Sequence, residues 1–138
     1  MIAYLDSSVV LRLLLGQPDR LSEWRTLKSA VASALVEVEC LRTLDRLRLR
    51  TEMAASQIAS HREALFGLID EMEIVEPTRP VLARAAQPLP VPLGTLDALH
   101  LATALLWREK EGKDLVMATH DTALGLAARA SGLRVIGI

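Results

Sequence analysis

The chain has 138 residues, of which 51% are hydrophobic, and its formal net charge is −1. This length is that of one ordinary domain, so residues 1–138 are expected to form a single domain. Two Trp, one Tyr and one Phe are too few for the aromatic platforms on which single-strand binding proteins stack bases. A net charge near zero leaves only local clusters of basic side chains to contact nucleic acid.

Cysteine content and the N-terminal segment indicate the cellular compartment. The single cysteine, Cys40, excludes a disulfide framework and cannot build a zinc site alone. Met1 leads directly into an apolar run over residues 2–5, without the basic segment and cleavage pattern of a signal peptide. No apolar run reaches the length needed to cross a bilayer. The sequence therefore predicts a soluble, cytoplasmic protein without a membrane partner.

The predicted elements alternate between short apolar strands and longer helices. Residues 2–5 are expected to form a strand buried on both faces, because four consecutive apolar residues suit that environment. Ser7 and Ser8 can cap the next helix, and Ser33 and Thr95 can cap two later helices. The remaining predictions, in chain order, are a helix over 9–15, a weak strand over 30–32, a helix from 33 to about 50, a helix over about 53–72, a strand over 73–76, a short helix over 80–86, an extended proline-containing connection over 88–92, a helix over 95–107, a strand over 115–118, a helix over 122–131 with Gly132 just beyond it, and a strand over 133–136.

This alternation indicates a parallel sheet covered by helices on both faces. In such sheets, ligands bind beyond the carboxyl ends of the strands, at the point where the strand order reverses. Acidic residues that lie far apart in the sequence can therefore belong to one site.

Four acidic residues are expected at this edge of the sheet. Asp6 directly follows the first strand, and Asp121 lies just beyond the strand over 115–118. Asp97 falls in the first turn of a helix, and Glu39 falls early in the helix after the second strand. Taken singly, each is better explained by helix capping or a surface ion pair. Four acids at one edge exceed what capping requires, so together they indicate a site.

The chemistry of carboxylates suggests what such a site would bind. Clustered carboxylates repel one another, and some stay protonated at neutral pH unless a cation joins them. Mg²⁺ prefers oxygen ligands, commonly uses a few carboxylates and keeps several waters. A bound water is then activated for hydrolysis while the metal offsets charge on a phosphate. Because no cysteine is expected at this edge, a thiolate-preferring metal is disfavoured.

Basic residues follow Glu39 along the same predicted helix. At helical spacing Arg42, Arg46 and Arg50 share a face with Glu39 and Thr43. Arginines leading away from a metal site would suit an RNA backbone, which makes Arg42 and Arg46 candidate RNA contacts. A solvated charged face, with Glu39 paired to Arg42, explains the same pattern equally well.

Hydroxyl groups and a histidine lie near the acids. Ser7 and Thr119 are candidates to orient Asp6, Asp121 or a bound water, although capping explains them equally well. His100 follows Asp97 by one helical turn and is expected to be a partly buried histidine with satisfied hydrogen bonds; the alternative is a supporting role at the site. The absence of a Gly-rich phosphate loop argues against ATP and dinucleotide chemistry.

Four segments of the chain carry a family resemblance: YLDSS at 4–8, SALVEVECLR at 33–42, LDALHLATA at 96–104 and ATHDTALGLAARASGL at 118–133. Together they resemble the PIN domains, and specifically the VapC toxins of bacterial toxin–antitoxin pairs. Their order and spacing cover essentially the whole chain, and the last two are the most specific. The family's acidic pocket maps onto Asp6, Glu39, Asp97 and Asp121, with Glu37 as a competitor for Glu39. The family's hydroxyl before the last acid corresponds to Thr119.

The resemblance implies a three-layer α/β/α sandwich with a mostly parallel central sheet. It also implies an endoribonuclease that depends on Mg²⁺ or Mn²⁺ and acts as the toxin of a type II toxin–antitoxin system. Asp6, Asp97 and Asp121 would hold the metal, and Glu39 would complete the site or position the attacking water. Expected partners are RNA, a second copy of the chain and a VapB-like antitoxin that blocks the acidic site. The alternatives are a PIN-fold module that binds RNA or protein without cleavage and, less favoured, a DNA nuclease.

Overall fold

The structure, a computed structural model, describes residues 1–138 and contains one five-stranded sheet. The strands are β1 (Ile2–Leu5), β2 (Ser29–Ser33), β3 (Glu73–Val75), β4 (Val116–Ala118) and β5 (Arg134–Ile136). Their order is β3-β2-β1-β4-β5, and every neighbouring pair is parallel. Strands β2 and β3 lie on one side of β1, and β4 and β5 lie on the other, so the strand order reverses between β1 and β4.

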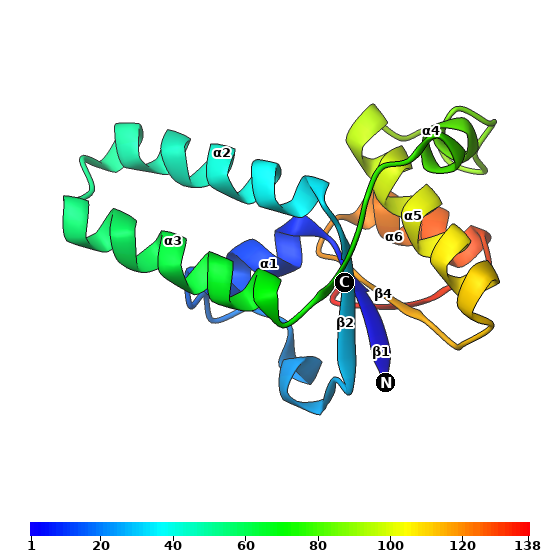
Figure 1. Cartoon of the computed structure of the whole chain (residues 1–138), viewed down its shortest axis with the longest axis horizontal. Coiled ribbons are helices and arrows are strands. Elements are labelled where there is room, and N and C mark those ends of the chain that lie inside the picture. Colours follow the sequence, from blue (N-terminus) through cyan, green and yellow to red (C-terminus); the bar gives the residue numbers. More distant parts are fainter.

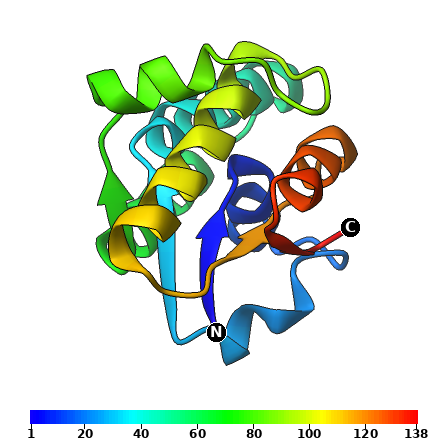
Figure 2. The ribbon, with the colours of Figure 1, turned by 90° about the vertical axis from the view of Figure 1, so that its right-hand side faces the viewer.

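Helices cover both faces of this sheet. They are α1 (Ser7–Leu14), the 3-10 helix η1 (Ser22–Thr26), α2 (Leu35–Thr51), α3 (Ala55–Asp70), α4 (Arg79–Ala85), α5 (Thr95–Glu111) and α6 (Thr122–Ala130). With the strands seen nearly edge-on, α1, α2 and α3 lie on one side and α4, α5 and α6 on the other (Figure 1). Viewed from that second side, α5 crosses in front of the strands with α6 beside it (Figure 2). The predicted three-layer α/β/α sandwich is confirmed.

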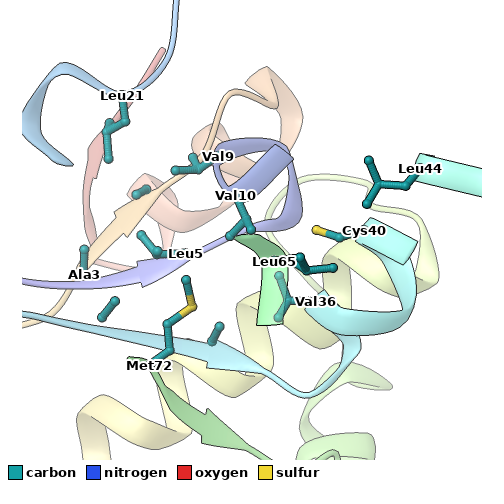
Figure 3. Close-up of a cluster of buried hydrophobic side chains, with 13 residues drawn as sticks. Ala3, Leu5, Val9, Val10, Leu21, Val36, Cys40, Leu44, Leu65 and Met72 are labelled. Atoms are coloured by element: carbon teal, nitrogen blue, oxygen red, sulfur yellow. The ribbon is translucent and has the colours of Figure 1, made fainter. Parts of the chain in front are cut away.

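Successive side chains of β1 point to opposite faces of the sheet and belong to two separate hydrophobic cores. Ala3 and Leu5 belong to the core under α1, α2 and α3, together with Leu65 (Figure 3). Tyr4 points to the opposite face and belongs to the core under α5 and α6, together with Leu101. Because successive residues of a strand face opposite sides, the continuously apolar run of β1 is what a strand between two helical layers requires.

Helices α2 and α3 form a hairpin that projects from the body of the molecule (Figure 1). In α2 the buried residues are Val36, Cys40 and Leu44, none of which lies in the last seven residues of the helix, and in α3 only Leu65 is buried. Cys40 is a buried free cysteine. The hairpin is therefore anchored at its base, where Glu39 lies, and exposed along most of its length.

Several predicted helix ends are wrong in detail. Helix α5 begins at Thr95 itself after Gly94, without a side-chain cap, and continues past Trp107 to Glu111. Helix α1 begins at Ser7 rather than residue 9. The sequence also gave no sign of η1. None of the helices combines the length and the apolar character that crossing a membrane requires.

Candidate functional site

The carboxyl edge of the sheet, between β1 and β4, holds the first and last of the predicted acids. Asp6 directly follows β1, and its backbone N–H donates to the carbonyl oxygen of Ala118 at the end of β4 (3.1 Å). Asp121 is the N-cap residue of α6, and its Oδ1 accepts the backbone N–H of Leu124 (3.0 Å). The strand pairing thus brings together two residues that are 115 positions apart in the sequence (121 − 6).

Three hydroxyl groups hold the carboxylate of Asp6, which is only 4% exposed. Ser8 and Thr119 donate to its Oδ2 at 2.7 and 2.8 Å, and Ser7 donates to its Oδ1 at 3.4 Å. Thr119 Oγ1 also accepts the backbone N–H of Asp121 (3.0 Å). The predicted capping of α1 by Ser7 and Ser8 is therefore wrong, because no side chain caps that helix and both hydroxyls contact the acid instead.

Glu39 approaches the same place from α2. Its Oε2 accepts the hydroxyl of Ser7 (3.2 Å), and Ser7 thereby contacts both Glu39 and Asp6. Its Oε1 lies 2.5 Å from His100 Nε2, and the side chain is 18% exposed. Glu37 is exposed on the same helix. Of these two glutamates, the structure thus places Glu39 beside Asp6.

His100 was expected to be a partly buried histidine with satisfied hydrogen bonds; it is fully buried, and both ring nitrogens contact partners. Its Nδ1 lies 2.7 Å from the hydroxyl of Tyr4, and its Nε2 contacts Glu39. Burial acts to lower the pKa of His100, but the hydrogen bond with Glu39 and the negative charges of Asp6, Glu39 and Asp97 outweigh it, so the pKa is raised. The link to Glu39 is a contact that the sequence did not specify.

Asp97 lies in the first turn of α5 and is partly exposed. Burial, followed by the negative charges of Asp121 and Asp6, raises its pKa above the ordinary value of 3.8; Glu39 adds a smaller effect in the same direction, and His100 opposes it. Each of the other three acids therefore acts on Asp97. The electrostatic repulsion expected of a shared acidic site is present.

The donor set fits a hard divalent cation better than a thiolate-bound metal. The four acids offer only carboxylate oxygens, whereas burial raises the pKa of the Cys40 thiol to about 12. Asp6 Oδ2 already accepts two hydrogen bonds, but Oδ1 accepts only the long contact from Ser7, so it retains capacity for another partner. As their side chains stand, no three His, Cys, Asp or Glu residues lie close enough to hold one metal ion, so binding would require the side chains to close around it.

The arginines of α2 lie on the exposed face of the hairpin. Arg42 pairs with Asp45 (3.3 Å), and Arg46 donates to Thr43 Oγ1 (3.0 Å). The pair between Glu39 and Arg42, which was the alternative explanation of this stripe, does not form. Both guanidinium groups thus remain accessible on the helix that carries Glu39.

Comparison with known proteins agrees with the fold and identifies the family. The family model described as PIN domain matches residues 3–130. A protein named Ribonuclease VapC46, from Mycobacterium tuberculosis H37Rv, is 35% identical over 137 residues, which cover 96% of this chain and 95% of that protein. The structure of FitAB bound to the IR36 DNA fragment superposes with a TM-score of 0.73 at 20% identity, covering 99% of this chain and 94% of the other. A toxin–antitoxin complex from Klebsiella pneumoniae superposes with a TM-score of 0.66 at 17% identity, covering 89% of each chain. The chain belongs to the PIN-domain family and is a VapC-type member of it.

Proposed function

We propose that this chain is an endoribonuclease dependent on Mg²⁺ or Mn²⁺, acting as the toxin of a type II toxin–antitoxin pair. The observation that carries the proposal is the position of four acids at the edge where the strand order reverses, where burial and then the charges of Asp121 and Asp6 raise the pKa of Asp97. The name of the relative from M. tuberculosis supports ribonuclease activity. The superposition on a toxin–antitoxin complex is consistent with a VapB-like antitoxin as partner. The cytoplasmic location and the homodimer remain predictions.

Asp6, Asp97 and Asp121 would hold the cation. Asp6 is the best fixed of the three, since its Oδ2 is bound by Ser8 and Thr119 while its Oδ1 keeps capacity for a further partner. When bound, the cation lowers the pKa of a water molecule and offsets negative charge on the phosphate. Ser7 and Thr119 would support the site by orienting carboxylates.

Glu39 would position the attacking water. Its carboxylate is held by Ser7 on one oxygen and by His100 on the other, so it is fixed beside Asp6. The water oxygen forms a bond to phosphorus in line with the departing ribose oxygen, and the phosphorus–oxygen bond to that ribose breaks. The products are a 3′-hydroxyl and a 5′-phosphate.

Cleavage of RNA by the purified chain tests this proposal. Cleavage in Mn²⁺ that stops on addition of a chelator, and that is absent with DNA, is the expected result. The rival is a PIN-fold module that binds RNA or protein without cleavage, and it is favoured by the separation of the acids as they stand. Metal-independent RNA binding without any cleavage would support the rival and exclude the nuclease.

The raised pKa of Asp97 predicts a pH-dependent loss of stability in the absence of metal. Because the folded-state pKa lies above the ordinary value of 3.8, ionised Asp97 destabilises the fold at neutral pH, and this penalty disappears as the pH falls below 3.8. Asp97→Asn should therefore raise the Tm by a few degrees near pH 7 and leave it unchanged in acid. The effect is modest because the side chain is partly exposed.

Melting curves of the two proteins across this pH range, in chelator, measure the difference. Mn²⁺ should then raise the Tm of the wild type more than that of Asp97→Asn, because a bound cation relieves the same repulsion. A Tm difference that does not change with pH, or equal responses to Mn²⁺, would argue against a shared acidic site.

Arg42 and Arg46 are proposed to contact the RNA backbone along α2. Replacing both by Ala should weaken RNA binding roughly tenfold at moderate salt and reduce the slope of log affinity against log salt by about 1–1.5. Fluorescence anisotropy with a labelled RNA, with chelator present, gives both quantities. Arg48→Ala is the control, because Arg48 lies on the same helix but outside the face that Arg42 and Arg46 share with Glu39. Equal losses for the double variant and the control would remove the proposed RNA contact.

A further inference from the structure

A chain of buried hydrogen bonds connects the backbone of β2 to the carboxylate of Glu39. The backbone N–H of Ser33 donates to the hydroxyl oxygen of Tyr4 (3.2 Å), which lies 2.7 Å from His100 Nδ1. His100 Nε2 in turn lies 2.5 Å from Glu39 Oε1. Tyr4 and His100 are both 0% exposed, so water does not compete for these contacts.

The acceptor at Glu39 indicates where the His100 ring carries its proton. A carboxylate oxygen accepts hydrogen bonds, so Nε2 donates to Glu39 Oε1. On a neutral ring, Nδ1 then has no proton and accepts the hydroxyl of Tyr4, whose oxygen also accepts the N–H of Ser33. A charged ring carries a proton on Nε2 as well, so Nε2 donates in both states.

Glu39 depends on such an anchor more than Asp6 and Asp121 do. Asp6 directly follows β1 and accepts three hydroxyls, and Asp121 is fixed by capping α6. Glu39 has a longer side chain with more rotamers to restrict, and its only other contact of this kind is Ser7 at 3.2 Å. The short contact with His100 is therefore its principal restraint.

We propose that His100 is a positioning residue that holds Glu39 Oε1, so that Oε2 stays on the side of Ser7 and Asp6, with Tyr4 fixing the ring. The inference rests on the proposed ribonuclease function, in which Glu39 positions the water. The competing explanation is that the three side chains only satisfy one another's buried polar groups. The two explanations differ in whether the donor at the Nε2 position matters to turnover.

Two substitutions distinguish the role of His100 Nε2 from that of Nδ1. The amide of His100→Gln reaches the position of Nε2 and can donate to Glu39, whereas the shorter amide of His100→Asn reaches only the position of Nδ1, next to Tyr4. We expect His100→Asn to lower kcat by about 10- to 100-fold with little change in KM. His100→Gln should recover most of that loss. Melting curves of both variants show whether stability accounts for the difference.

Equal kcat values for the Asn and Gln variants, at similar Tm, would overturn the proposal, whether both are active or both are impaired. A wild type that does not cleave RNA would instead defeat the proposed function, so the two failures are distinguishable. A second measurement does not depend on activity or on the variants folding. In ¹⁵N-histidine NMR spectra of the metal-free wild type, the neutral His100 ring should be the Nε2–H tautomer; an Nδ1–H tautomer would contradict the proposal, because Nε2 would have no proton to donate.

Discussion

Replacing Asp6 by Asn should reduce Mn²⁺-dependent RNA cleavage by about a thousandfold or more while the chain remains folded. Asp6 is the most buried of the four acids, and its carboxylate accepts hydroxyls from Ser7, Ser8 and Thr119. Asn keeps the shape but removes the charge, so the cation loses its best-fixed ligand. The fold survives because each of these hydroxyls can accept as well as donate a hydrogen bond. Initial rates of cleavage, with a melting curve of each protein, measure the effect.

Asp97→Asn and Asp121→Asn should have effects of similar size, since each removes another charge from the same site. Asp114→Asn is the control, because Asp114 is exposed and precedes β4, at the opposite end of that strand from the acids. Expression of the wild type without an antitoxin should arrest growth, and expression of the inactive variants should not. Unchanged cleavage by any two of the three site variants would defeat the assignment of the metal site.

Replacing Leu65 by Ala should lower the free energy of unfolding by about 3–4 kcal/mol. Leu65 is 0% exposed and is the one buried residue of α3. Figure 3 shows it close to the first buried residues of α2, Val36 and Cys40, and beside the α1 side chain Val10. Removing it leaves a cavity where α3 is anchored, next to the turns of α2 that carry Glu39. Chemical denaturation measures this loss of free energy. In a thermal melt, the same loss should lower the Tm by roughly 10 °C or more.

Leu49→Ala provides the matched control for this loss. Leu49 has the same side chain on the same helical hairpin but is 67% exposed, so its removal should change stability by less than about 0.5 kcal/mol. Similar losses for both variants would mean that Leu65 is not the anchor of the hairpin.

The fold was largely predictable because it depends on short apolar runs. Each of the five strands was predicted to within one residue at its ends. The buried central strands β1 and β4 consist entirely of apolar residues, as strands covered on both faces require. The reversal of strand order then places residues after β1 and β4 together, and Asp6 and Asp121 lie where that rule expects acids. Helix starts were less predictable, because a hydroxyl such as that of Ser7 suits a cap and a buried carboxylate equally well.

The hydrogen bonds that support the candidate site were much less accessible to sequence reasoning. His100 and Glu39 are 61 positions apart, and no local pattern links them. The available signal was that His100 follows Asp97 by one helical turn and therefore shares its face of α5. Tyr4 reads as an ordinary core residue of an apolar strand, and its contact with His100 depends on how α5 packs across the sheet.

The shared metal site is tested most directly by a crystal of this protein grown with Mn²⁺ and measured near the manganese absorption edge. We expect one anomalous peak within about 2–2.5 Å of carboxylate oxygens of Asp6, Asp97 and Asp121, with these side chains turned toward it. Manganese bound to a single acid, or located away from this edge of the sheet, would contradict the account.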